Sequence, residues 1–145
     1  MLQLATVIAK EEIADNIFEL VLQTDLNNYT LRPGQFVHVR VSKSTEHVLR
    51  RPISISNLDK SNNQITITFR AEGAGTTKLA DIKDGETIDI LMPLGNGYDI
   101  STEKAGTHVL IGGGGIGVPP LYELSKQLNL KGVKTTHVLG FNSEK

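Results

Sequence analysis

The sequence predicts a six-stranded antiparallel Greek-key β barrel followed by the beginning of an α/β domain. From Leu2 to Met92, short runs rich in Val, Ile, Thr and Phe alternate apolar and polar residues, which is the pattern of half-buried strands. From Thr107 the pattern changes to a continuous apolar run, a glycine loop, a helical segment and a second apolar run. We therefore expect a barrel domain at residues 1–100 and the first β-α-β portion of an incomplete second domain at residues 101–145.

Six segments are expected to form the barrel strands: Leu2–Ala9, Ile17–Gln23, Phe36–Val41, Ile53–Asn57, Ile65–Arg70 and Thr87–Met92. Turn-forming residues separate several of them. Arg32–Gln35 contains a proline-glycine pair, Lys60–Asn63 is typical of a hairpin loop, and Asp84 with Gly85 is suited to a tight turn. Six such strands suffice to close a small barrel.

The segment from Thr107 reads as a strand, THVLIGGGGIG, then a helix, VPPLYELSKQLNLKG, and a second strand, KTTHVLGF. Two strands joined in this way are expected to be parallel and both buried. A doubly wound domain needs further βα units to cover both faces of its sheet, so we expect the chain to be part of a longer protein. The alternative is a small β domain with one β-α-β appendage, or with a partner chain beside it.

Composition excludes several classes of protein. Fifteen Lys and Arg residues against 16 Asp and Glu residues predict neither a nucleic-acid partner nor an anionic membrane partner. The absence of cysteine excludes disulfides, Cys-ligated zinc and Cys-ligated iron–sulfur clusters within these residues. There is no secretory leader pattern and no run of apolar residues long enough to span a membrane, so a cytoplasmic location is expected.

Three segments are suited to binding phosphate, and the first is RRPISI at Arg50–Ile55. Arg51 can offer a planar pair of donors to a phosphate. Pro52 lacks an N–H and belongs at a strand start or edge, while Ile53 and Ser54 should point to opposite faces of the strand. Arg50 should point away from Arg51. An ordinary edge strand after a basic loop would explain the same letters.

The second segment is EGAGTTKL, in which Gly73 and Gly75 let backbone amides approach an anion. Thr76 is expected to cap a short helix, TTKLADI, whose positive end would face the anion. A plain tight turn with a capped helix is the alternative.

The third segment is the glycine run from Gly112 to Gly117, which precedes a helix with Pro119 and Pro120 in its first turn. It could hold a dinucleotide phosphate, or permit close packing of strand against helix. The four histidines, His38, His47, His108 and His137, lack metal-ligand spacing, and no metal site, catalytic triad or carboxylate pair is expected.

The order of these motifs, with FRAEGAGTTKL and MPLGNGYD, resembles the ferredoxin reductase superfamily of flavoproteins, in which a flavin-binding barrel precedes a nicotinamide-nucleotide domain. Within it, the segments are most similar to the electron transfer subunits of type B dihydroorotate dehydrogenases. The resemblance covers the whole chain, but only about the front half or somewhat more of such a subunit. Family members carry a cysteine-rich tail that ligates a [2Fe-2S] cluster, and this sequence has no counterpart to it.

The resemblance implies that Arg51 pairs with the FAD pyrophosphate, that Ile53 lies alongside the isoalloxazine or ribityl chain, and that Ser54 reaches the N5 edge. Many relatives carry Tyr where this chain has Ile53. The full set of implied FAD contacts is Arg51, Pro52, Ile53, Ser54, Thr68, Phe69, Arg70, Gly75 and Thr76.

The implied function is electron transfer in pyrimidine biosynthesis. A catalytic subunit bearing FMN oxidises dihydroorotate, and its electrons pass through the [2Fe-2S] cluster and FAD to NAD. Alternatives are a reductase component of another oxidoreductase of the superfamily, or a non-catalytic flavin-binding docking module. Because its nicotinamide domain is expected to be incomplete, this chain alone should show little NADH-dependent turnover.

Overall fold

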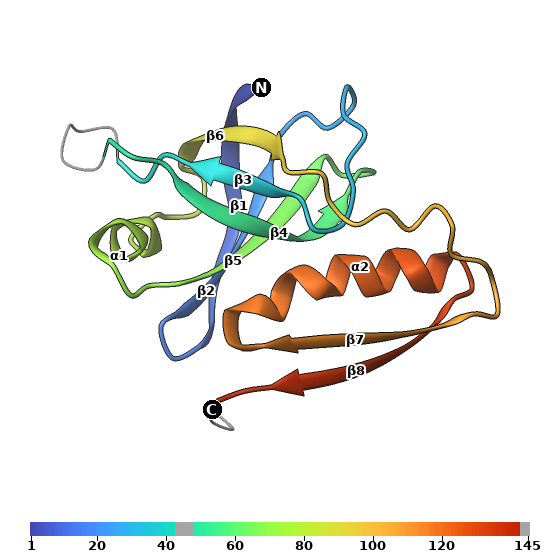
Figure 1. Cartoon of the computed structure of the whole chain (residues 1–145). Coiled ribbons are helices and arrows are strands. Elements are labelled where there is room, and N and C mark those ends of the chain that lie inside the picture. Colours follow the sequence, from blue (N-terminus) through green and yellow to red (C-terminus); the bar gives the residue numbers. More distant parts are fainter. Residues whose placement is uncertain (43–47, 143–145) are drawn as a thin grey trace.

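The computed structural model describes residues 1–42 and 48–142, and its first part is a closed barrel of antiparallel strands (Figure 1). The strands are β1 (Leu2–Ala14), β2 (Ile17–Gln23), β3 (Phe36–Val39), β4 (Arg51–Asp59), β5 (Gln64–Arg70) and β6 (Thr87–Leu94). Their order around the barrel is β1-β2-β5-β4-β3-β6. The predicted Greek-key barrel, followed by the start of a parallel sheet, is confirmed.

Strand β1 extends beyond the segment predicted for it. The sequence predicts an end at Ala9, but β1 continues to Ala14 and pairs with β2 through Glu12 opposite Phe18. Asn16, at φ 58°, turns the chain into β2. Residues 10–12 are polar and lie in the projecting hairpin, where both faces meet solvent and the apolar alternation is lost. Register shifts at two points of β1 accommodate the extra length.

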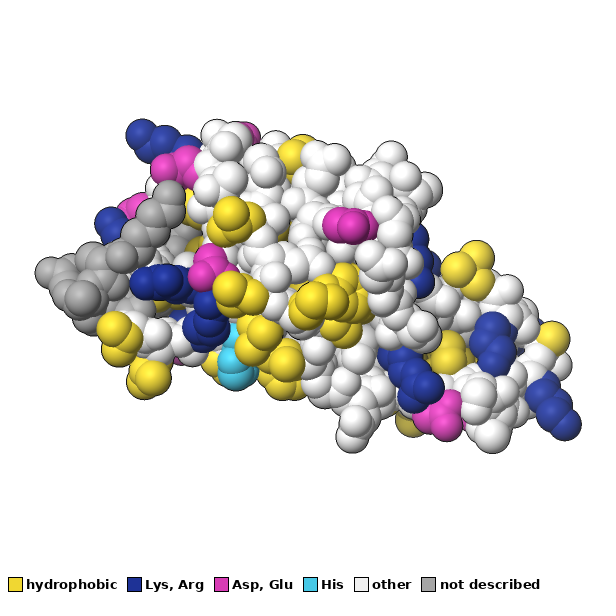
Figure 2. All heavy atoms as spheres, turned by 90° about the horizontal axis from the view of Figure 1, so that it is seen from above, with side chains coloured by type: hydrophobic (Ala, Val, Ile, Leu, Met, Phe, Trp, Pro, Cys, Tyr) yellow, Lys and Arg dark blue, Asp and Glu magenta, His cyan; other side chains and the backbone are white. Residues whose placement is uncertain are grey.

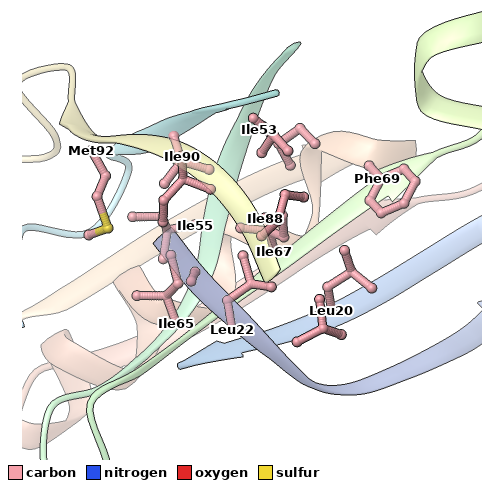
Figure 3. Packing of buried hydrophobic residues seen from close by; sticks show 14 of the residues in the cluster. Leu20, Leu22, Ile53, Ile55, Ile65, Ile67, Phe69, Ile88, Ile90 and Met92 are labelled. Carbon is pink, nitrogen blue, oxygen red and sulfur yellow. The ribbon is translucent and has the colours of Figure 1, made fainter. Parts of the chain in front are cut away.

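The barrel interior is a single apolar core (Figure 3). Leu20 and Leu22 of β2, Ile65 and Ile67 of β5, and Ile90 of β6 are all at 0% exposure. The two residues of each pair are two positions apart. Because successive side chains of a strand point to opposite faces, both members of a pair point into the barrel. Burying a side chain of this size contributes roughly 1.5–3 kcal/mol, so the core holds β2, β5 and β6 together.

Two further parts of the chain lie outside the barrel. Helix α1 (Ala74–Ala80) follows β5 and packs onto the core through Leu79, which is 2% exposed. The second part of the chain comprises β7 (His108–Gly114), the 3-10 turn η1 (Gly115–Gly117), α2 (Pro119–Leu130) and β8 (Lys134–Gly140). Strands β7 and β8 are parallel, as predicted, and α2 lies between their sheet and β4 (Figure 1).

The expectation that both parallel strands are buried is wrong, because β7 and β8 each leave one face exposed. Helix α2 covers one face of the β7–β8 sheet through Ile111, Leu121 and Leu128, whereas no element of the described chain covers the other. Leu110 and Val138 on that face are 70% and 63% exposed. Burial of a parallel sheet requires covering elements on both sides, and residues 1–42 and 48–142 supply them on one side.

The surface shows apolar side chains between charged ones. On the face seen from above, hydrophobic patches lie between groups of Lys, Arg, Asp and Glu side chains (Figure 2). Leu2 and Leu4 of β1 are among the exposed apolar residues of the chain. No helix in the described part of the chain is both long and apolar enough to cross a membrane.

Candidate cofactor site

Arg51 and Gly75, both expected at a phosphate site, are in direct contact. Arg51 begins β4, and its Nη1 donates to the carbonyl of Leu49 at 2.7 Å. The rest of its guanidinium lies over Gly75 in the first turn of α1, where an added β-carbon would stand 2.6 Å from Nε. The first amides of a helix have no intrahelical acceptor. A guanidinium beside such amides is a suitable arrangement for a phosphate group.

Thr76 does not cap α1 in the way the sequence predicts. The helix begins two positions earlier, with Gly73 in an extended conformation as its N-cap. Thr76 stands inside the first turn, where its Oγ1 accepts the Gly73 N–H and donates to the Gly73 carbonyl, both at 3.1 Å. Because the hydroxyl bonds back to Gly73, it holds the loop before the helix.

Arg50 belongs to a different part of the surface from Arg51. Its Nη2 pairs with Asp89 Oδ2 of β6 at 2.9 Å, and its Nη1 donates to the Asp89 carbonyl at 3.1 Å. Arg50 is therefore held by Asp89 on the barrel surface, and its guanidinium is part-buried. The residue links β4 to β6.

Strand β4 directs its remaining predicted contacts to two faces. Ile53 is 6% exposed and lies in the barrel core (Figure 3). The Ile53 side chain therefore fills the barrel core, and the implied contact of this residue with a flavin stays a prediction. Pro52 is exposed and Ser54 half-buried, and both alternate with the core positions, so they point outward.

Strand β5 shows the same division between core and outer face. Phe69 is 3% exposed and stacks on Phe18 with ring centroids 5.9 Å apart, so its side chain is also a core residue. Thr68 and Arg70 lie on the outer face and line a cavity. Arg70 pairs with Glu72 at 3.0 Å, which holds its side chain near the start of the α1 loop.

The cavity has a volume of about 640 Å³ and lies between the barrel and the second part of the chain. Ser56, Asn57, Thr66 and Thr68 form its barrel wall, and the opposite wall comes from η1 and the start of α2. The two walls include these residues: Ile13, Ala14, Asp15, Ile17, Glu19, Ser56, Asn57, Thr66, Thr68, Arg70, Gly115, Ile116, Val118, Pro119, Tyr122, Phe141 and Asn142. Both walls are needed to form the cavity.

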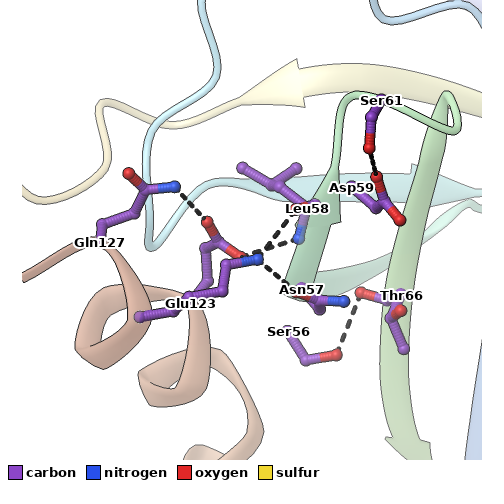
Figure 4. A network of polar contacts seen from close by, with 9 residues as sticks. Ser56, Asn57, Leu58, Asp59, Ser61, Thr66, Glu123 and Gln127 are labelled. Atoms are coloured by element: carbon purple, nitrogen blue, oxygen red, sulfur yellow. Dashed lines mark hydrogen bonds and ion pairs between the residues drawn. The ribbon is translucent and has the colours of Figure 1, made fainter. Parts of the chain in front are cut away.

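Two hydroxyl groups on the barrel wall are fixed by hydrogen bonds. Ser56 Oγ donates to the Thr66 carbonyl at 3.1 Å, and Thr68 Oγ1 donates to Ser56 Oγ at 3.3 Å (Figure 4 shows the first). Sequence reasoning identified Thr68 but not Ser56, Asn57 or Tyr122 as lining residues. The alternation that makes Ser54 outward also makes Ser56 outward, and this was the available signal.

The glycine run serves packing as well as access to the cavity. A β-carbon at Gly113 would overlap the Leu121 side chain of α2, whereas Gly112 and Gly117 have open space. Gly115 has a φ of 52° and lines the cavity. Close packing of strand against helix, the alternative left open by the sequence, thus accounts for Gly113.

The histidines within residues 1–42 and 48–142 do not form one site. His108 Nε2 contacts Thr136 Oγ1 at 2.7 Å on the β7–β8 sheet, and the His38 ring lies against Phe36. His47 lies outside the described residues. Within the ranges that are described, no cluster of three or more His, Cys, Asp or Glu side chains could hold a metal ion.

Residues 4–98 match the model of the oxidoreductase FAD-binding domain family. The chain belongs to this family. The matched range contains all six barrel strands and α1, and therefore includes the Arg51–Gly75 contact. FAD is the cofactor after which this family of domains is described.

Curated relatives refine the family. The chain is 56% identical over 138 residues to the electron transfer subunit of dihydroorotate dehydrogenase B (NAD(+)) of Lysinibacillus sphaericus, covering 95% of this chain and 53% of the relative. It is 54% identical to the subunit of the same name from Bacillus pumilus, covering 97% of this chain and 54% of the relative. The chain thus spans about half the length of these curated relatives, and the resemblance drawn from its motifs is confirmed.

Solved structures share the architecture. An NADH-dependent reduced ferredoxin-NADP oxidoreductase, described for flavin-based electron bifurcation, has a TM-score of 0.84 at 30% identity, covering 97% of this chain and 49% of that one. Ferredoxin-NADP+ reductase from Plasmodium falciparum has a TM-score of 0.78 at 14% identity, covering 97% and 60%. The second likeness shows the fold alone.

Proposed function

We propose that the chain is the FAD-binding portion of an electron transfer subunit of dihydroorotate dehydrogenase. The observation that carries the FAD site is the contact of the Arg51 guanidinium with Gly75 at the first turn of α1. A β-carbon at position 75 would force the guanidinium to shift, so glycine permits this close approach of backbone and cation. A pyrophosphate needs both kinds of donor.

The rest of the cofactor would follow β4 from this point. A strand advances about 3.3 Å per residue, so Arg51 and Ser56 are separated by roughly 17 Å along β4. The outward positions between them are Pro52 and Ser54, two of the predicted contacts. This length suits an extended cofactor whose phosphates lie at Arg51 and whose ring lies at the cavity between Thr68 and η1.

The chain's own groups would bind and orient the cofactor. Arg51 and the amides near Gly75 would neutralise the phosphates, while the hydroxyls of Ser54, Ser56 and Thr68 offer donors and acceptors to the polar edge of a ring. Tyr122 and Ile116 on the facing wall would limit water at the ring. Bound FAD supplies the chemistry itself, since it exchanges two electrons with a nicotinamide and single electrons with a one-electron partner.

In the complete subunit we infer that electrons from a catalytic FMN subunit reach FAD through a [2Fe-2S] cluster and leave to NAD, in pyrimidine biosynthesis. High identity to relatives named as electron transfer subunits supports this inference. The 145 residues contain no cysteine, so the cluster's thiolate ligands would lie elsewhere in the assembly. Residues 1–100 would be the FAD-binding domain, and residues 101–145 would begin the domain that receives NAD.

The test is retention of FAD by the purified chain. After incubation with FAD and removal of unbound cofactor, the wild type should keep the visible flavin absorption bands. Arg51→Ala should lose them, because the phosphates would then lack their cation. Arg32→Ala removes an exposed arginine on another turn and serves as the matched control, which should retain the bands. Loss of flavin from the wild type, or equal retention by Arg51→Ala, would contradict the proposed site.

A further inference from the structure

Glu123 of α2 is the one charged residue that the described ranges bury completely, with a side chain 1% exposed. An ionised carboxylate is costly to bury unless its oxygens are satisfied. Glu123 lies on the helix that forms the far wall of the cavity, so the partners of its carboxylate bear on how that wall is held.

Both oxygens of Glu123 are occupied (Figure 4). Oε2 accepts the backbone N–H of Leu58 on β4 at 2.8 Å and pairs with Lys126 Nζ at 2.6 Å. Oε1 accepts the side-chain amide of Gln127 at 2.7 Å. The carboxylate therefore joins α2 directly to the backbone of the strand that carries Arg51 and Ser54.

The contact falls where β4 is irregular. The pairing of β4 with β5 shifts register between Ile55 and Asn57, and such a bulge locally disrupts the ladder of backbone hydrogen bonds. Glu123 provides an acceptor for the Leu58 amide just beyond it. The geometry of the β4 segment next to Ser56 thus depends on a side chain of α2.

Lys126 extends the connection to both walls of the cavity. Its Nζ donates to Asn57 Oδ1 and to the Leu58 carbonyl, the latter at 2.8 Å, and lies 5.9 Å from the centre of the Tyr122 ring. Asn57 lines the barrel wall and Tyr122 lines the facing wall. A single ion pair therefore contacts residues on the two sides of the opening.

We propose that Glu123 is a positioning residue for the cofactor ring: with Lys126 it holds α2 against β4 and sets the width of the cavity between Asn57 and Tyr122. This inference rests on the proposed function, because it takes that cavity as the place of the flavin ring. Glu123 does not line the cavity and acts only through the residues that do.

The role predicts a selective effect on the ring end of the cofactor. Glu123→Ala leaves the Leu58 N–H and the Lys126 ammonium without their partner, and α2 should move away from β4. Affinity for FAD should then fall about tenfold or more, whereas affinity for ADP, which has the pyrophosphate but no flavin ring, should stay within about twofold. Glu123→Gln keeps an acceptor for Leu58 and should recover part of the FAD affinity.

Two measurements on the 145-residue chain test this. Titrations with FAD and with ADP give the ratio of the two dissociation constants for the wild type, Glu123→Ala and Glu123→Gln. Because the chain has no cysteine, spin labels can be placed uniquely at exposed Asn62→Cys and Leu130→Cys, on the β4–β5 turn and on α2. Their distance distribution reports the separation of α2 from β4 without any flavin, and it should broaden in Glu123→Ala.

The outcomes are distinguishable. A raised FAD to ADP ratio with a broadened distance distribution supports the positioning role. An unchanged ratio in Glu123→Ala would overturn the positioning role, and so would equal weakening of both ligands with a lowered Tm. Neither result would contradict the proposed FAD site. A wild type that binds neither ligand would overturn the proposed function and the positioning role together.

Discussion

The guanidinium of Arg51 lies so close over Gly75 that no side chain fits between them. A β-carbon at position 75 would meet Nε, Nη2 and Cζ of Arg51 at 2.6, 2.7 and 2.8 Å. These two residues are 24 positions apart and belong to β4 and α1. Their contact joins the arginine motif and the glycine motif into one candidate phosphate site.

Gly75→Ala should weaken FAD binding without unfolding the chain. Gly75 does not have a positive φ, and Ala favours a helix over Gly by about 1 kcal/mol, so the helix itself should tolerate the change. The guanidinium must move instead, and we expect FAD affinity to fall about tenfold. Fluorescence titration with FAD and a thermal melt measure the two effects.

The matched control is Gly73→Ala, because a β-carbon there meets nothing within 4 Å. It should keep FAD affinity within about twofold. If both alanine variants bind FAD as the wild type does, the contact with Arg51 is irrelevant to the cofactor.

Arg50→Ala should show the opposite profile from Arg51→Ala. Arg50 pairs with a half-buried Asp89, whose Oδ1 is buried and has no hydrogen-bond partner among the described residues. Removing the arginine leaves this carboxylate without its main cation, and we expect the free energy of unfolding to fall by about 1–3 kcal/mol. FAD retention should be unchanged.

Chemical denaturation of Arg50→Ala, Asp89→Ala and the double variant checks this pair. Residues in direct contact should give a double variant that loses less than the sum of the singles. Strict additivity, or flavin loss in Arg50→Ala, would count against a purely structural role.

Gly113→Ala should destabilise the second part of the chain by overpacking. Its β-carbon would overlap the Leu121 side chain of α2, and inserting a methyl group into a packed interface typically costs about 1–3 kcal/mol. Leu121→Ala in the same chain should relieve the overlap, although it leaves a smaller side chain in the core. Hydrogen exchange of the β7 and α2 amides would locate the effect.

Gly112→Ala provides the comparison, since a β-carbon at Gly112 would meet nothing within 4 Å. We expect no measurable loss of stability there. Equal destabilisation by the two alanines would mean that backbone freedom, rather than packing against Leu121, requires the glycines.

Asp59 should titrate with a pKa below its ordinary value. Its pKa lies below the ordinary 3.8, chiefly because the Ser61 hydroxyl donates to the carboxylate, with further bonds from Asn62. Because the folded pKa is lower than the unfolded one, the ionised form favours folding above about pH 4. That contribution is lost as the pH falls through the folded pKa.

Carbon-13 NMR of the Asp59 carboxyl across acidic pH measures this directly. Ser61→Ala should raise the Asp59 pKa toward its ordinary value. Ser101→Ala should leave Asp59 unchanged and instead raise the pKa of Asp99, which Ser101 lowers. An Asp59 titration that is insensitive to Ser61→Ala would exclude the hydroxyl as its cause.

Local pattern was sufficient for most elements of this fold. Strand β2 ends where the alternation of Ile17–Gln23 ends, and the expected turns at Gly34 and Gly85 both have positive φ values near 85°. The predicted start of α1 was wrong, because the Thr76 hydroxyl accepts the Gly73 N–H and does not cap a helix that begins after it. Both placements use plausible local hydrogen bonds, so sequence alone could not decide between them.

The amino-acid sequence by itself determined the barrel, the following β-α-β unit, the family resemblance and the pairing of an arginine motif with a glycine motif. These depend on side-chain periodicity and backbone freedom, which are properties of neighbouring residues. Only the tertiary structure decided that Ile53 turns into the core, that Ser56 and Tyr122 face one cavity, and that Glu123 accepts the amide of Leu58, 65 residues away. Such contacts depend on which strands and helices pack together, because partners distant in the chain meet only after the barrel has closed.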